Sequence, residues 1–201
     1  MIEEAVAAIQ AGKPVVLPTD TVYGLCADPY RAEPAREVYR LKGRPEAQPS
    51  ALLARDVELL FECVPELRGR AGMLVRAFLP GPYTLILPNP ARRYRWLTGD
   101  NPDAIGVRVP ELEGPAAQVL ERVGSVLATS ANLHGRPDPR RLEDVPEEIR
   151  AGCAVLLDGG ELPGTPSTVL DLTGDEPRVV REGAVPAQEA LERALGATAG
   201  R

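Results

Sequence analysis

The chain has 201 residues, of which 44% are hydrophobic and 26% charged, so it is long enough to bury a substantial core. Its formal net charge is −6 and its isoelectric point about 5.0, whereas proteins that mainly grip a nucleic-acid backbone are usually basic. This acidity favours an ordinary soluble protein and disfavours a dedicated nucleic-acid binder.

Hydrophobic spacing predicts elements of both kinds along the first half of the chain. Ile2, Val6 and Ile9 share one helical face, and Gly12 ends that helix. The run Val15–Leu17 predicts a short buried strand. The elements expected up to residue 109 are a helix over 2–11, a strand over 15–17, a helix over 31–41, a strand over 50–54, helices over 56–62 and 66–78, and strands over 83–87 and 105–109.

The second half of the chain continues the same alternation. A Gly-Asp pair inside residues 173–177 predicts a hairpin between the last two strands, and Pro186 suits the first turn of a closing helix. The expected elements are a helix over 115–123, strands over 125–129, 154–158, 167–172 and 178–181, and a helix from 186. The pattern predicts an α/β protein with a mixed sheet. No linker separates two cores, so we expect a single domain over residues 1–201.

Cysteine content and the N-terminal segment limit the cellular setting. Cys26, Cys63 and Cys153 are widely spaced and form no C-x-x-C motif, which disfavours a disulfide framework and a zinc site. Residues 1–13 are acidic and only mildly apolar, unlike a signal peptide. No run approaches the ~20 apolar residues of a membrane span. We therefore predict a cytoplasmic protein that has no membrane partner and no metal site of its own.

Polar side chains cluster at the predicted strand ends, where open α/β sheets bind ligands. Thr19, Asp20 and Thr21 follow the first strand beside Gly24, which lets backbone or ligand come close. The same residues are also compatible with an ordinary polar turn.

Basic residues occupy two of the predicted element ends. Lys42 and Arg44 lie where a helix ends, so they either stabilise its C-terminus or bind phosphate or carboxylate. Arg108 lies in a strand between Val107 and Val109, which should face the opposite side. Burying an unpaired guanidinium is costly, so Arg108 should meet water, a carboxylate of the fold or a ligand carboxylate.

Hydroxyl and amide groups follow another apolar strand. Ser130 and Asn132 can donate and accept hydrogen bonds, Ser167 opens a later strand and Arg181 ends another. The chain has neither a Walker motif nor a G-x-G-x-x-G motif, so an ATP site here would be of another type. It also has no G-x-S-x-G elbow, and the single histidine, His134, is expected in a surface loop.

Taken in order, seven short motifs run through nearly the whole chain. They are PTDTVYGL (18–25), KGRP (42–45), PGPYTLIL (80–87), RVP (108–110), TSAN (129–132), PSTVLDL (166–172) and REGA (181–184). This ordered set resembles the YrdC/Sua5 family of threonylcarbamoyl-AMP synthases, with a single YrdC-like domain. The resemblance implies a YrdC/RibB-like fold, in which flanking helices and a twisted mixed β-sheet surround a concave, positively lined cavity.

The resemblance also implies a reaction. A nucleotidyltransferase of this family would convert L-threonine, bicarbonate and ATP, with Mg²⁺ as helper, into L-threonylcarbamoyl-adenylate and pyrophosphate. The product would supply the N6-threonylcarbamoyl group of adenosine 37 in tRNA, through tRNA-modifying transferase proteins that act downstream.

Roles for individual residues follow from the same resemblance. Lys42 and Arg44 would be catalytic. The ATP-binding residues would be Lys42, Arg44, Ser130, Asn132 and Arg181, and the threonine-binding residues would be Thr21, Arg108 and Ser167. The chain departs from the family pattern, in the adenine and threonine pockets, at Gln48, Leu53, His134 and Asp138.

Two alternatives stay open at this point. One is an RNA-binding or ribosome-maturation protein of the same fold, because arginine and aromatic residues alternate over 92–96 and could give weak RNA binding. A solvated loop explains that stretch as well. The other is a related adenylation that starts from carbamoyl phosphate in place of threonine and bicarbonate.

Overall fold

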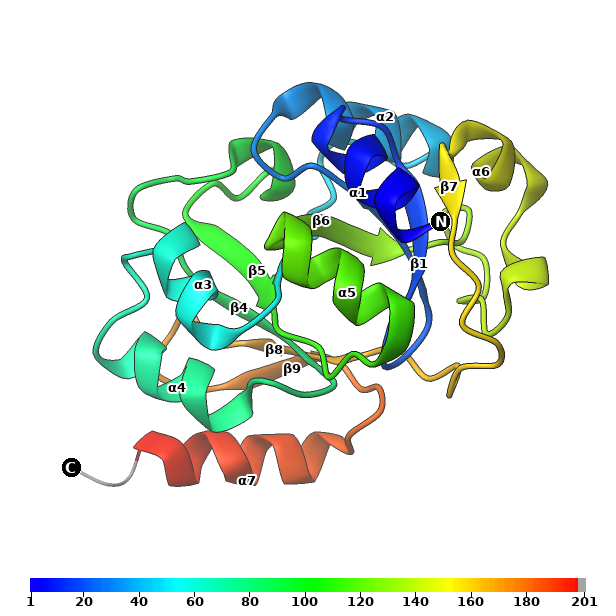
Figure 1. Cartoon of the computed structure of the whole chain (residues 1–201). Helices are drawn as coiled ribbons and strands as arrows, with labels where there is room; N and C mark the ends of the chain where they lie inside the picture. Colours follow the sequence, from blue (N-terminus) through cyan, green and yellow to red (C-terminus); the bar gives the residue numbers. More distant parts are fainter. Residues whose placement is uncertain (199–201) are drawn as a thin grey trace.

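One mixed β-sheet forms the centre of the computed structural model, which describes residues 1–198 and leaves 199–201, the end of the expected domain, outside that range. Its nine strands lie in the order β7-β1-β2-β6-β3-β5-β4-β8-β9 (Figure 1). The pairs β1–β7, β3–β5 and β4–β8 are parallel and the other neighbours are antiparallel. The expectation of a mixed α/β sheet is therefore confirmed.

Most elements lie close to their expected ranges. The strands are β1 Val15–Pro18, β2 Tyr23–Ala27, β3 Ala51–Ala54, β4 Tyr83–Pro88, β5 Ala104–Arg108, β6 Ser125–Ser130, β7 Val155–Leu156, β8 Thr168–Asp171 and β9 Arg178–Arg181. The helices are α1 Ile2–Gln10, α2 Ala32–Lys42, α3 Val57–Cys63, α4 Arg70–Phe78, α5 Gly114–Val123, α6 Glu147–Gly152 and α7 Ala187–Thr198, with short 3₁₀ turns η1 Arg95–Leu97 and η2 Leu142–Asp144. The predicted hairpin is the antiparallel β8–β9 pair.

The sequence pattern failed at three places. Strand β2 was not predicted, because all five of its residues are buried and show no alternation after the polar turn. The short helix α6 was also missed. The helix expected over 66–78 begins only at Arg70, since Gly69 adopts a φ of +54° just before it.

The two faces of the sheet are covered differently. Helices α2, α3, α4, α6 and α7 pack on one face, against side chains that include Leu25, Leu52, Leu85, Val107 and Leu127. Successive strand residues point to opposite faces, so their neighbours in the chain belong to the second face. The large core on the first face therefore anchors the strands from which the second face is built.

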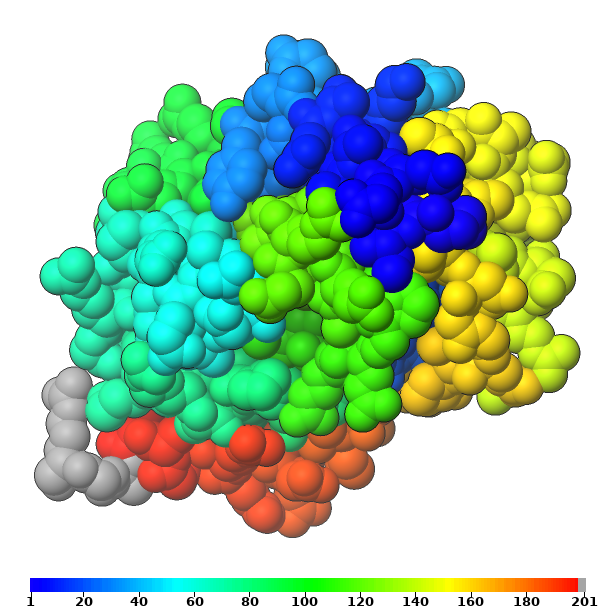
Figure 2. Space-filling model, in the orientation of Figure 1, coloured from blue at the N-terminus to red at the C-terminus, as the bar shows by residue number. Residues whose placement is uncertain are grey.

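Among the helices of residues 1–198, α1 and α5 are the two that cover the second face, and they cover only part of it. These two helices contact each other and lie side by side in dark blue and green (Figure 2). Their cluster includes Val15, Cys26, Leu53 and Val126, which come from β1, β2, β3 and β6. The same face continues across β5, β4 and β8, and a cavity begins there. Within residues 1–198, no helix is both long and apolar enough to cross a bilayer.

Candidate functional site

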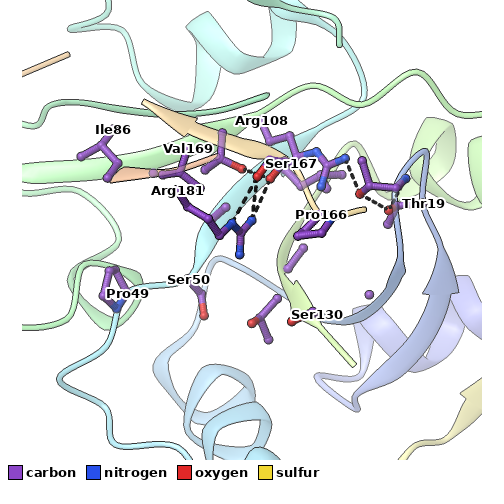
Figure 3. A pocket seen from close by; sticks show the side chains of 18 of the residues that line it. Thr19, Pro49, Ser50, Ile86, Arg108, Ser130, Pro166, Ser167, Val169 and Arg181 are labelled. Atoms are coloured by element: carbon purple, nitrogen blue, oxygen red, sulfur yellow. Dashed lines mark hydrogen bonds between the residues drawn. The ribbon is translucent and has the colours of Figure 1, made fainter. Parts of the chain in front are cut away.

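A cavity of about 380 Å³ lies on the second face of the sheet, with its lining contributed by seven strands and the loops at their ends (Figure 3). The lining residues alternate along β3, β4, β5 and β8, as Thr84 and Ile86 do on β4 and Gly106 and Arg108 on β5, whereas three consecutive residues line the cavity where β6 ends. This alternation follows from the period of two in a strand. The side chains between them lie in the large core on the opposite face.

Three small residues form the floor of the cavity. Ala128, Ala51 and Gly106 are Cα partners across β6, β3 and β5, and all three line the cavity. A Cβ built on Gly106 would meet nothing closer than Ser50 O at 3.6 Å, so the space above the strand is open. The sequence analysis did not single out these residues, because their contribution is the absence of a side chain.

The Arg108 side chain marks one end of the cavity and is almost completely buried. Its Nη2 donates to the carboxylate of Asp20 and, over 3.0 Å, to Thr21 Oγ1. Thr21 Oγ1 also lies 3.1 Å from Thr19 Oγ1. The Nε of Arg108 has no partner within residues 1–198. Of the partners expected for this arginine, a carboxylate of the fold is present, and part of the guanidinium remains available to a ligand.

Burial shifts the pKa of both members of this ion pair. Desolvation raises the pKa of Asp20, and the nearby Arg108 opposes that rise. Desolvation also lowers the pKa of Arg108, while Asp20 opposes that change. We take the pair as ionised, because separating a buried carboxylate from its guanidinium partner is costly. The pair therefore adds little net charge to this end of the cavity.

Ser167 joins the Arg108 end to the middle of the cavity. Its Oγ lies 2.8 Å from Thr84 Oγ1, and Arg181 Nη2 donates to Ser167 O over 2.9 Å and to Ser167 Oγ over 3.2 Å. Ser167 is 2% exposed, whereas Arg181 is exposed at the surface. Figure 3 shows Arg181 beside Ser167, on the same side as Val169.

Arg44 marks a second basic position on the cavity wall. It follows α2, whose last residue Lys42 is succeeded by Gly43 at a φ of +59°, a left-handed conformation that ends the helix. Arg44 Nη1 donates to Thr129 Oγ1 over 2.9 Å and Nη2 donates to Pro49 O. Its Nε is buried without a partner within residues 1–198. The guanidinium is thus held by neutral groups.

Two predicted site residues, Lys42 and Asn132, do not line the cavity. Lys42 Nζ donates to Ser130 O, to Asn132 O over 2.7 Å and to Asn132 Oδ1 over 3.0 Å. Ser130 Oγ in turn donates to Asn132 Oδ1 over 2.6 Å. Ser130 lines the cavity, so Lys42 and Asn132 lie directly behind it. The remaining predicted residues, Thr21, Arg44, Arg108, Ser130, Ser167 and Arg181, all line the cavity.

The positions where the chain departs from the family pattern lie in different surroundings. Leu53 lines the cavity. Gln48 Nε2 lies 3.4 Å from His134 Nε2, and this contact joins the loop after Arg44 to the loop after Asn132. His134 is exposed, as expected for a loop residue.

The stretch considered for RNA stacking is engaged within the fold. Arg92 pairs with Asp103 and Arg93 pairs with Glu66. Trp96 Nε1 donates to Pro29 O over 2.8 Å, and its ring packs against the larger core. The aromatic ring and these two arginines therefore already have partners.

Metal-binding donors are sparse in the part of the chain that the structure describes. No group of three or more His, Cys, Asp or Glu side chains there is arranged to hold a metal ion. The carboxylate that lines the cavity, Asp171, accepts from Thr173 and from Arg178. A divalent cation here would depend on oxygens supplied by a substrate.

Comparison with known proteins gives a consistent result. A model of the Sua5/YciO/YrdC family, described as "Telomere recombination", matches residues 7–183. A putative threonylcarbamoyl-AMP synthase of Mycobacterium tuberculosis is 36% identical over 98% of this chain and 90% of its own length.

A second relative is longer than this chain. Threonylcarbamoyl-AMP synthase of Pyrococcus abyssi is 35% identical over 97% of this chain, which spans 57% of that protein. The crystal structure of P. abyssi Sua5 complexed with L-threonine superimposes with a TM-score of 0.86 at 35% identity, and it covers 97% of this chain and 57% of the Sua5 chain. The fold described above is therefore shared with proteins of this kind.

Proposed function

We propose that this chain, which belongs to the Sua5/YciO/YrdC family, is a nucleotidyltransferase that makes L-threonylcarbamoyl-adenylate from L-threonine, bicarbonate and ATP. Pyrophosphate is the second product. The adenylate would serve the threonylcarbamoylation of tRNA position 37 in the cytoplasm, through transferase proteins that act downstream. Relatives named threonylcarbamoyl-AMP synthase support this proposal.

The observation that carries the proposal is the presence of two different basic positions in one cavity. At one end, Arg108 and Asp20 form a nearly neutral pair beside Thr21 and Ser167, which suits an amino acid that bears both charges. At the other position, Arg44 has only neutral partners and suits a polyanion such as triphosphate. A site that joins an amino acid to a nucleotide needs both.

Threonine would bind with its carboxylate on Arg108. Thr21 and Ser167 would contact the rest of the amino acid, because both hydroxyls lie at that end of the cavity. The ammonium group of threonine first gives a proton to solvent, and the resulting amine combines with bicarbonate to give a carbamate and one water. A carbamate oxygen then attacks the α-phosphorus of ATP as the bond to pyrophosphate breaks.

Fixed positive charges would account for most of the rate enhancement. Negative charge accumulates on the phosphate oxygens as pyrophosphate leaves, and Arg44 and Arg181 would stabilise it from opposite parts of the wall. Ser130 would add a hydroxyl hydrogen bond when its proton turns from Asn132 Oδ1 to a phosphate oxygen. The chain needs no nucleophile of its own, so catalysis rests on holding the two substrates in line.

Mg²⁺ would enter with ATP. Magnesium usually keeps several waters and binds through substrate phosphates together with one or two carboxylates. Asp171 is the acidic side chain within the cavity lining and would supply the protein's carboxylate to the ion. The ion would screen the triphosphate and help pyrophosphate to leave.

Release of pyrophosphate tests the proposal directly. The purified protein is incubated with ATP, Mg²⁺ and bicarbonate, with L-threonine, with L-serine, or with no amino acid. We expect release that depends on threonine, with serine much weaker. Release that needs carbamoyl phosphate and ignores threonine would replace the proposal with the related adenylation.

A failed assay would direct attention to the RNA-binding alternative. If ATP and threonine neither react nor raise the melting temperature, salt-dependent binding of RNA becomes the property to measure. The net charge of −6 and the paired state of Arg92 and Arg93 count against that outcome.

A further inference from the structure

The ammonium group of Lys42 is fully used within the fold. It has three protons, and the structure provides three acceptors, namely Ser130 O, Asn132 O and Asn132 Oδ1. The residue is 4% exposed and does not line the cavity. In this arrangement no proton of the ammonium group remains for a ligand.

The loop that Lys42 contacts is also held by other hydrogen bonds, among them one from Asn132 Nδ2 to Arg136 O. The main chain of Lys42 also contributes, because His134 N donates to Lys42 O over 3.0 Å. Ala131 N donates to Tyr23 O over 2.8 Å on the other side of the loop. The carbonyls of Ser130 and Asn132 both point toward the end of α2, and Lys42 satisfies both. Without that donor, the carbonyls of Ser130 and Asn132 would lose this partner, and Asn132 Oδ1 would keep only the Ser130 hydroxyl, which is unfavourable for buried acceptors.

From these contacts, and resting on the proposed function, we infer that Lys42 is a positioning residue. Its hydrogen bonds hold residues 130–134 against the end of α2, an arrangement called the latch below, and so fix the position of the Ser130 hydroxyl in the cavity. Arg44, in contrast, contacts the phosphates. The two members of the Lys-x-Arg motif thus have separate tasks. Arg44 lies in the cavity wall and Lys42 lies behind it.

The charges around Lys42 make the latch sensitive to pH. Burial and, to a smaller extent, the charge of Arg44 on the following loop lower the pKa of Lys42 to about 7, although Asp138 on the loop after β6 opposes the change. A neutral amine has two protons for three acceptors, so the latch weakens as the pH rises above about 7. We therefore expect kcat/KM for ATP to fall on the alkaline side.

The contribution of Lys42 to the free energy of unfolding should instead increase over the same pH range. Unfolded lysine keeps its proton up to its ordinary value of 10.5, whereas folded Lys42 loses it at about 7. The unfolded state therefore binds more protons between these values, and the contribution of Lys42 to stability increases with pH. An alkaline loss of activity with no fall in melting temperature would separate loosening of the latch from unfolding.

Amide hydrogen exchange tests the latch without any ligand. Lys42→Met keeps most of the side-chain volume and removes the donors, and Arg44→Ala is the matched control. We expect exchange over residues 130–136 to rise at least ~10-fold in Lys42→Met and to change little in Arg44→Ala. Unchanged exchange in Lys42→Met would overturn the inference, whether or not the protein makes the adenylate. Should Lys42→Met fail to fold, Lys42→Gln, which keeps an amide donor for part of the acceptor set, should raise exchange in the same segment by a smaller factor.

Nucleotide affinity distinguishes a latch from a phosphate contact. Dissociation constants for adenosine, AMP and ATP are measured by calorimetry in both variants. Arg44→Ala should weaken ATP much more than adenosine, because it removes a phosphate contact. Lys42→Met should weaken all three by a similar factor of ~10. The inference would be overturned if the loss of affinity in Lys42→Met grew with the number of phosphates on the nucleotide, as is expected for Arg44→Ala.

Discussion

The two arginine positions in the cavity differ in how their charge is compensated. Arg108 is paired with Asp20 inside the fold, and the exposed fractions of the two side chains are 9% and 10%. Arg44 has a hydroxyl and a carbonyl as partners and makes no ion pair within residues 1–198. The first position therefore favours a substrate that carries both charges, and the second favours an anion. The order of the substrates along the cavity follows from this difference.

The largest effect is expected at Arg108. Arg108→Ala would remove the carboxylate partner of threonine and leave Asp20 buried without a counter-charge, which costs about 3–5 kcal/mol of stability. We expect threonine-dependent pyrophosphate release to fall more than ~100-fold and the protein to melt at a lower temperature.

A double variant separates the two consequences. Asp20→Asn combined with Arg108→Met removes both charges and should recover much of the stability without recovering the use of threonine. Arg92→Ala, which breaks an exposed pair with Asp103, is the control for a surface arginine. Recovery of threonine turnover in the double variant would show that Arg108 does not contact the amino acid.

The second-largest effect is expected for Arg44→Ala, which should lower activity about 100-fold and leave the fold intact. The loss should appear in the steps that involve ATP, since Arg44 is the uncompensated charge on the wall. Steady-state kinetics with each substrate varied in turn provides the measurement. Arg40→Ala, on the exposed side of α2 and paired with Glu37, is the matched control. A rise in the KM for threonine alone would contradict the assignment of the two ends.

Gly106→Val tests the floor between the two ends. The added methyl groups would extend from the sheet into the cavity, where the nearest atom to a new Cβ is 3.6 Å away. We expect activity to fall roughly 10-fold and stability to change by less than about 1 kcal/mol, since valine suits a strand. Gly174→Val lies in the β8–β9 turn with nothing within 4 Å of its Cβ and serves as the control. Full activity in Gly106→Val would mean that the substrates do not use the floor.

The smallest effect is expected at Arg181. Its side chain is exposed and donates to Ser167 O and Oγ, so Arg181→Ala should lower kcat by about 3–10-fold with no measurable loss of stability. Val180→Ala, on the same strand and 61% exposed, controls for changes to the edge of the sheet. If Arg181→Ala lowered kcat more than Arg44→Ala does, the main phosphate contact would have to be assigned to Arg181 on β9.

Local rules predicted most of the elements. The apolar runs gave the strands from β3 onwards, and Arg108 with Val107 and Val109 gave the correct alternation across β5. Strand β2 was missed because burial on both sides erases the alternation on which such a prediction depends. Among the cavity-lining residues, Ala51 and Gly106 carry no functional group that a sequence search could find.

The amino-acid sequence by itself determined the family, through motifs whose order is fixed along the chain, and the residue types that the cavity offers. Only the tertiary structure decided which charges meet. Asp20 and Arg108 are 88 residues apart, and Lys42 and Asn132 are 90 residues apart. Such partners are chosen by the order in which the strands pair in the sheet, and spacing along the chain does not encode that order.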